Sequence, residues 1–182
     1  MGGNIEQRRI AGVVLAGGRS QRFGRDKAEQ RYGDRKLIDW SIAALQPLVG
    51  TVFVSGRDYP PFVSVADRPE PGMGPLGGIA GAMAAAKAAG YTHLLSLPCD
   101  TPDVAPDQLA QLCKSPDSAY LAACPVIGLW PADQAEKLAE HLAGGGRRSV
   151  RAWADAQGAA AIDGDDIANI NSVEDLERLS GR

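Results

Sequence analysis

The chain has 182 residues, of which 45% are hydrophobic and 23% charged, with a net charge of −3. These values predict one soluble globular domain over residues 1–182, with residues 1–8 as a flexible N-terminus. They argue against a nucleic-acid binder, and no apolar run approaches the roughly 20 residues needed to span a bilayer. The three cysteines form no C-x-x-C pair, so neither a disulfide framework nor a zinc site is expected. A cytoplasmic location is the expectation.

A glycine-rich loop follows the first predicted strand, which is an apolar run over residues 10–15. Gly17 and Gly18 lack Cβ atoms, so backbone N–H groups there can approach an anion closely. Cations recur through the rest of the loop, at Arg19, Arg22, Arg25 and Lys27. Such a loop suits a polyphosphate. The alternative is a sharp strand-to-helix turn with a solvated basic face.

A helix and two strands are predicted next. Helical spacing of apolar residues predicts a helix over residues 37–48, and short apolar runs predict strands over residues 51–55 and 62–66. Asp67 stands directly after the second of these strands. Ligands in open α/β sheets bind at such carboxyl ends.

Residues 70–81 are predicted to form a long irregular loop that merges into an Ala-rich helix over residues 80–89. Long loops in compact domains are often functional, and the start of this helix is a potential anion or base-edge site. Gly78 and Gly81 equally allow the helix to pack close to the sheet. Both interpretations stand at this point.

A central strand is predicted over residues 93–97, and it ends in Pro98-Cys99-Asp100-Thr101-Pro102. Asp100 can reach a ligand held over the sheet, and Mg²⁺ in phosphoryl-transfer sites is held by one or two carboxylates plus substrate phosphates. An Asp in a Pro-rich turn otherwise caps a helix. Asp103 and Asp107 are better placed to cap the helix predicted over residues 108–114. Asp100 is therefore a candidate metal ligand.

The last third of the chain contains two more groups of polar candidates. Strands are predicted over residues 120–124 and 125–130, helices over 132–143 and 150–156, and an edge strand over 159–162. The loop between the two helices combines a triple glycine with Arg147 and Arg148, which suits an acceptor phosphate or is a flexible connection with solvated charges. If the final segment is extended, Asn169 and Asn171 point to one side. Capping is the alternative role for Asn171.

The alternation of strands and helices predicts an α/β fold with helices on both faces of the sheet. Three elements that suit an anionic ligand lie at successive strand ends: the glycine-rich loop, residues 72–81 and Asp100. A nucleotide–Mg²⁺ site explains this coincidence better than unrelated turns do.

Residues 15–27 resemble the signature L-A-G-G-x-x-x-R-x-G-x-D-K of sugar-nucleotidyltransferase-like enzymes. Within that superfamily the doubled glycine is most similar to the molybdenum cofactor guanylyltransferases, which attach GMP to molybdopterin. Residues 74–79 resemble the G-P-L-x-G-I element of the family, residues 98–102 its metal-binding motif, and residues 169–176 its N-x-N-T-P-E-D-L ending. The resemblance implies a three-layer Rossmann-like nucleotidyltransferase fold with a mostly parallel sheet flanked by helices.

The resemblance also implies an activity, which is transfer of GMP from GTP to molybdopterin with release of pyrophosphate. Mg²⁺ is the expected cofactor. Cofactor-delivery or acceptor enzymes are the expected protein partners, and neither nucleic acid nor a membrane is expected. An acceptor phosphate is already anionic near neutral pH, so no general base is needed. Catalysis then rests on positioning and on charge stabilisation.

The residue roles follow from these motifs and from the chemistry. Asp100 is the expected metal ligand, and Ser55 stands where the family often has Asn. The expected catalytic residues are Arg22, Lys27 and Asp100. The expected nucleotide-binding residues are Leu15, Ala16, Gly17, Gly18, Lys27, Ser55, Asp67, Gly77 and Asp100. The expected acceptor-binding residues are Arg147, Arg148, Asn169 and Asn171.

Three alternatives share much of this pattern. A CTP-dependent molybdopterin cytidylyltransferase or a sugar-phosphate nucleotidyltransferase has the same site with another base or acceptor. A non-catalytic nucleotide-binding module keeps the loop without turnover. Residues 115–130 are shorter than is usual in the family, which leaves the acceptor open.

Overall fold

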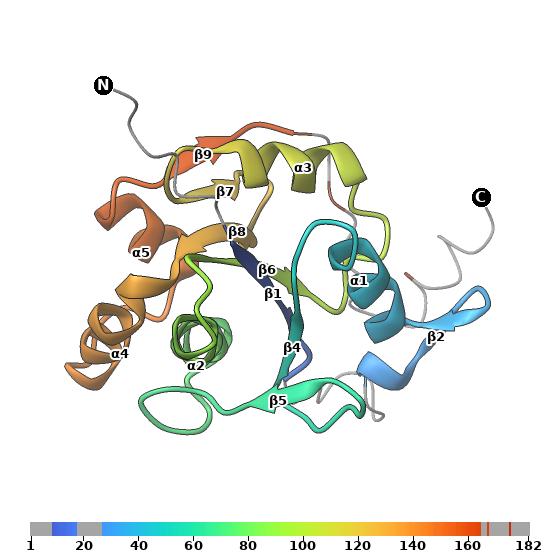
Figure 1. Ribbon diagram of the computed structural model, residues 1–182, viewed down its shortest axis with the longest axis horizontal. Coiled ribbons are helices and arrows are strands. Elements are labelled where there is room, and N and C mark those ends of the chain that lie inside the picture. The colour runs from blue at the N-terminus through green and yellow to red at the C-terminus, as the bar shows by residue number, and fades with distance from the viewer. Residues whose placement is uncertain (1–8, 18–26, 165–166, 168–174, 176–182) are drawn as a thin grey trace.

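A mixed seven-stranded sheet forms the centre of the computed structural model, in the order β5-β4-β1-β6-β8-β7-β9 (Figure 1). The structure describes residues 9–17, 27–164, 167 and 175. Parallel pairing joins β1 to β4 and β6, β4 to β5, and β7 to β9, whereas β8 runs antiparallel to both of its neighbours. The strands are β1 (Ile10–Leu15), β4 (Val52–Ser55), β5 (Val63–Val65), β6 (His93–Pro98), β7 (Ala119–Leu121), β8 (Cys124–Pro131) and β9 (Ala160–Ile162).

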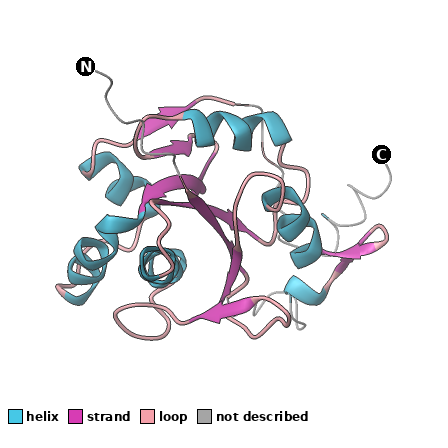
Figure 2. Cartoon of the chain, in the orientation of Figure 1, coloured by secondary structure: helices cyan, strands magenta, loops and turns pink. Residues whose placement is uncertain are grey.

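Helices cover both faces of this sheet (Figure 2). One face carries α2 (Pro75–Ala88), α4 (Ala135–Ala143) and α5 (Val150–Ala156), and the other carries α1 (Leu37–Leu45) and α3 (Pro106–Lys114). Strand β1 shows why both faces are covered. Its Val13 side chain is buried among the first set of helices and its Val14 side chain among the second, because successive strand residues point to opposite faces. The predicted three-layer α/β fold with a mostly parallel sheet is confirmed.

Most predicted elements are present with shifts of a few residues at their ends. The strand over residues 10–15 and the helix over residues 150–156 have the predicted bounds, and β9 is an edge strand as expected.

None of the helices in the described part of the chain is long and apolar enough to cross a membrane. The predicted N-terminal segment 1–8 lies outside the described residues.

The helix expected over residues 80–89 is corrected to α2, which already begins at Pro75. Proline fits the first helical position because its fixed φ suits a helix and its missing N–H is not needed there. Gly74 precedes it with φ +72°, a backbone conformation that favours glycine. The irregular segment is therefore shorter than predicted, and Gly77, Gly78 and Gly81 lie within the helix.

The predicted caps of α3 are also wrong. Ala105 occupies the N-cap position and makes no side-chain cap hydrogen bond, and Asp107 lies in the first turn of α3. Asp103 instead accepts a hydrogen bond from the Tyr32 hydroxyl, at 3.2 Å. Tyr32 belongs to a small hairpin that sequence patterns did not predict, formed by β2 (Arg31–Tyr32) and β3 (Arg35–Lys36).

Candidate active site

The parallel strands β1, β4, β5 and β6 end level with one another. Leu15 lies opposite both Ser55 and Pro98, and Ser55 lies opposite Val65. The segments that leave these strands therefore start at one edge of the sheet, where ligands of α/β folds bind. This register brings together the predicted nucleotide residues that follow or end these strands. They are Leu15, Ala16, Gly17, Ser55, Asp67 and Asp100.

The segments that leave β1 and β4 touch each other through their backbones, at Gly17 and Gly56. The Ala16 N–H donates to the Ser55 carbonyl at 2.9 Å. A Cβ atom on Gly56 would lie 2.2 Å from the Gly17 Cα, and Gly56 has φ +90°. The start of the glycine-rich loop is thus held against the exit of β4. Sequence reasoning missed Gly56, although its place directly after a predicted strand is a usable signal.

Asp67 organises the segment after β5. Its carboxylate accepts hydrogen bonds from the Ser55 hydroxyl at 3.4 Å and from the Gly72 N–H at 3.2 Å. Ser55 is only 3% exposed. The structure therefore gives Ser55 a supporting contact with Asp67, alongside its predicted nucleotide role.

The start of α2 packs tightly against the same edge. A Cβ atom on Gly77 would lie 2.4 Å from the Met73 Cβ and 3.2 Å from the Asp67 Cβ, and one on Gly78 would lie 2.6 Å from the Ser55 Oγ. A Cβ atom on Gly81 would lie 1.9 Å from the Ala66 carbonyl oxygen. These contacts support the interpretation that the glycines let the helix approach the sheet. They also place Gly77 beside Asp67.

Asp100 stands on a turn that is fixed from several sides. The Cys99 N–H donates to the Leu15 carbonyl at 3.1 Å, and the hydroxyls of Thr101 and Ser41 donate to the Pro98 carbonyl at 3.2 and 3.1 Å. Burial and the neighbouring Asp100 carboxylate raise the pKa of the Cys124 thiol. The thiol therefore stays protonated near neutral pH, and its side chain is buried.

The residues around Asp100 fit Mg²⁺ only together with a nucleotide. Across the described ranges, no group of three or more His, Cys, Asp or Glu side chains could hold a metal ion. Mg²⁺ usually keeps several waters and binds one or two carboxylates plus substrate phosphates. The Asp100 carboxylate at the end of β6, where phosphates are expected, matches that donor set.

Of the remaining predicted site residues, three lie in the part of the chain that the structure describes and four lie outside it. Arg147 and Arg148 lie in the loop between α4 and α5, and the Arg148 guanidinium donates to the Gly72 carbonyl at 3.4 Å. This contact joins the predicted acceptor loop to the segment after β5. Lys27 begins the short helix η1 (Lys27–Glu29). Gly18, Arg22, Asn169 and Asn171 lie outside the described residues.

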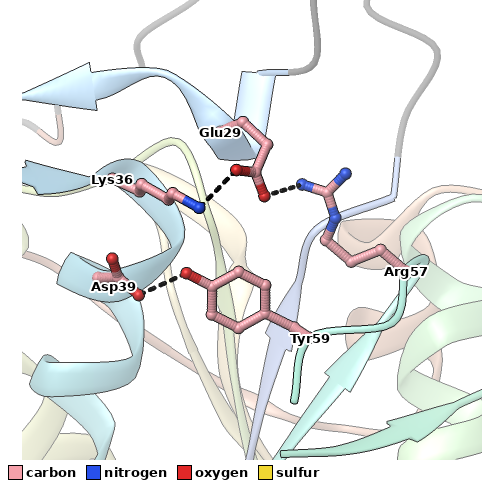
Figure 3. Close-up of polar contacts among 5 residues, drawn as sticks. All are labelled: Glu29, Lys36, Asp39, Arg57 and Tyr59. Carbon is pink, nitrogen blue, oxygen red and sulfur yellow. Dashed lines mark hydrogen bonds and ion pairs between the residues drawn. The ribbon is translucent and has the colours of Figure 1, made fainter. Parts of the chain in front are cut away.

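A polar network holds η1 at the end of the glycine-rich loop (Figure 3). Glu29 lies between two cations, with 2.6 Å to the Lys36 Nζ and 3.4 Å to the Arg57 Nη1. Beside it, the Tyr59 hydroxyl donates to Asp39 at 2.7 Å. Arg57 directly follows Gly56, so its ion pair with Glu29 joins η1 to the segment that leaves β4. Sequence reasoning missed it, because its members are far apart in the chain.

Tyr59 in this network gives a pH-dependent prediction. Burial, and then the hydrogen bond to Asp39, raise the pKa of Tyr59 to about 12, compared with about 10 in an unfolded chain. A raised pKa adds stability below the unfolded value that is lost as pH rises through the folded value. We expect the free energy of unfolding of wild type to exceed that of Tyr59→Phe near pH 8, and this difference to shrink between about pH 10 and about pH 12. Urea unfolding across this range measures it, and a constant difference would contradict the assignment.

Known proteins resemble this chain along most of its length. The family profile of the MobA-like NTP transferase domain matches residues 12–162. A molybdenum cofactor guanylyltransferase from Cereibacter sphaeroides is 35% identical to this chain over 184 residues, which cover 93% of this chain and 95% of the relative. Another from Rhizobium leguminosarum bv. trifolii is 37% identical over 161 residues, covering 81% and 76%.

Solved structures share the fold at lower sequence identity. Molybdopterin-guanine dinucleotide biosynthesis protein A from Archaeoglobus fulgidus superimposes with a TM-score of 0.71 at 20% identity, covering 94% of this chain and 97% of that one. The 2-C-methyl-D-erythritol 4-phosphate cytidylyltransferase from Thermus thermophilus gives 0.70 at 17% identity, covering 93% and 96%. The fold is therefore shared by enzymes that use different bases, and it does not by itself select the base.

Proposed function

Because this chain belongs to the MobA-like NTP transferase family, we propose that it is a molybdenum cofactor guanylyltransferase. It transfers GMP from GTP to molybdopterin and releases pyrophosphate. One observation carries the proposal. Strands β1, β4, β5 and β6 end at the same level of the sheet, so that Gly17, Asp67 and Asp100 lie at one edge. Relatives about one-third identical along most of the chain bear this name.

In the proposed reaction, GTP lies across this edge of the sheet. Backbone groups of Leu15 to Gly18 contact the nucleotide, and Ser55, Asp67 and Gly77 line the side toward α2. Asp100 would hold Mg²⁺, which would offset the negative charge of the phosphates. Lys27 and Arg22 stabilise the charge that accumulates around the α-phosphorus.

The acceptor enters from the side of the α4–α5 loop. Arg147, Arg148, Asn169 and Asn171 bind molybdopterin and orient its terminal phosphate. An oxygen of that phosphate attacks the α-phosphorus, and the bond to the β-phosphate oxygen breaks as pyrophosphate leaves. We place the reaction in a single domain in the cytoplasm, where other enzymes deliver the acceptor or receive the product.

Arg148→Ala tests the acceptor side. A hydrogen bond from a cation to a phosphate is worth about 1.5–3 kcal/mol, so the KM for molybdopterin should rise about tenfold to hundredfold. The KM for GTP should stay within about twofold, because the loss concerns ground-state binding of the acceptor alone. Initial rates with each substrate varied separately measure both values, and Lys137→Ala on the exposed side of α4 is the control. An equal rise in both KM values would contradict this role.

The base and the acceptor are tested by a turnover assay. Purified protein, Mg²⁺ and molybdenum-loaded molybdopterin are incubated with each nucleoside triphosphate separately, and pyrophosphate release is followed. Product from GTP alone supports the proposal. Product from CTP would assign the chain as a cytidylyltransferase. GTP binding without product from any nucleotide would favour a sugar-phosphate acceptor or a non-catalytic module.

A further inference from the structure

His141 lies near the end of α4 and contacts the loop that follows it. Its Nε2 lies 3.1 Å from the Arg147 carbonyl oxygen. Because a carbonyl oxygen only accepts hydrogen bonds, Nε2 carries the proton and donates. On its other side the imidazole packs against the indole of Trp153 on α5, with 5.1 Å between ring centroids. Trp153 is 5% exposed, so the ring rests on a fixed surface.

The loop itself, residues 144–149, has a defined shape. The Gly145 N–H donates to the Leu142 carbonyl at 3.1 Å and the Gly146 N–H to the His141 carbonyl at 2.8 Å. Gly145 has φ +76°, and a Cβ atom on Gly146 would lie 2.3 Å from the His141 Cε1. The triple glycine therefore lets the chain turn tightly over the imidazole, and the alternative of a merely flexible connection does not explain these contacts.

The far end of the loop is fixed as well. Ser149 caps α5 by accepting a hydrogen bond from the Ala152 N–H at 3.3 Å. Arg148 reaches the Gly72 carbonyl, and the Gly72 N–H donates to Asp67. A chain of contacts thus runs from His141 through the arginine pair to the nucleotide side of the site.

We propose that His141 is a positioning residue that holds the backbone of Arg147 and so presents Arg147 and Arg148 to the phosphate of the acceptor. This inference rests on the proposed function of the loop. His141 does not touch either substrate. Its contribution is to fix the arginines before the acceptor binds, which lowers the entropy cost of binding.

The test compares His141→Ala, His141→Gln and the control Lys137→Ala. We expect His141→Ala to raise the KM for molybdopterin roughly three- to tenfold, the loss typical of one hydrogen bond, with the KM for GTP unchanged. Gln retains an N–H that can donate to the Arg147 carbonyl, so His141→Gln should recover part of the loss. A role in stability alone would lower the melting temperature and leave both KM values of the folded enzyme unchanged, which would overturn the proposal.

Hydrogen exchange gives a readout that does not depend on activity. In His141→Ala we expect amide exchange at Gly144, Gly145 and Gly146 to accelerate roughly tenfold, because local opening frees their N–H groups from backbone carbonyls of α4, while exchange in β1 stays at the wild-type rate. Unchanged exchange over the loop would overturn the proposal. If wild type fails to transfer GMP at all, the proposed function fails by itself, and loop exchange still decides whether His141 holds the loop.

Discussion

Asp100→Asn should reduce kcat for formation of the guanine dinucleotide by about 10²–10³-fold, the usual cost of losing one electrostatic contact to the reacting group. Asn preserves the size of the side chain but lacks the charge that holds Mg²⁺. The turn is fixed by bonds from Cys99, Thr101 and Ser41 that do not involve the Asp100 side chain. The fold should therefore persist, and far-UV circular dichroism checks this.

Asp103→Asn is the matched control for this prediction. Asp103 is a carboxylate three positions along the chain, engaged with the Tyr32 hydroxyl, and we expect its variant to keep kcat within a fewfold of wild type. The Mg²⁺ concentration needed for half-maximal rate should rise only in Asp100→Asn. An unchanged rate together with an unchanged half-maximal Mg²⁺ concentration in Asp100→Asn would remove Asp100 from the metal site.

Gly56→Ala should lower the free energy of unfolding by about 2–5 kcal/mol, from a left-handed backbone conformation combined with overpacking. The new Cβ atom would lie 2.2 Å from the Gly17 Cα, and backbone on both sides leaves no flexible side chain to move. Displacement of Gly17 should also weaken GTP binding, because it shifts the N–H groups that we propose bind the phosphates. Urea unfolding and GTP titration measure the two effects.

Gly33→Ala separates the two causes. Gly33 has φ +62°, but a Cβ atom there would meet nothing within 4 Å. Its variant should lose only about 1–2 kcal/mol and keep the wild-type affinity for GTP. Equal losses in stability and in GTP affinity for both variants would show that the Gly17–Gly56 contact has no special role.

The elements that sequence patterns predicted well are those fixed by local signals. Strand β1 can be identified from its own apolar run. Helix α5 can be identified from residues 150–156 and the Ser149 that precedes them. The ends of the predicted strands indicated where a ligand would bind, because parallel strands in register bring the segments that follow them to one edge of the sheet. The position of Asp67 and Asp100 at this edge was therefore predictable from the chain alone, and their roles stay predictions.

The features that sequence patterns missed depend on contacts between distant segments. The role of Gly56 depends on its contact with Gly17, and the role of Glu29 depends on its ion pair with Arg57. His141 has the pattern of an ordinary helix residue, and its role depends on the packing of Gly146 over its ring. Local spacing predicts a helix-cap role for Asp103, but its carboxylate accepts a hydrogen bond from the Tyr32 hydroxyl instead. In each case a tertiary partner decides the role.

Isotope transfer distinguishes attack of an acceptor phosphate on the α-phosphorus of GTP from every other reaction at this site. The protein is incubated with Mg²⁺, molybdenum-loaded molybdopterin and GTP labelled with ³²P at either the α- or the γ-phosphate. If this attack takes place, we expect the α-label to enter the pterin product and the γ-label to leave in pyrophosphate. Transfer of the γ-label to the pterin, or binding of GTP without transfer of either label, would contradict it.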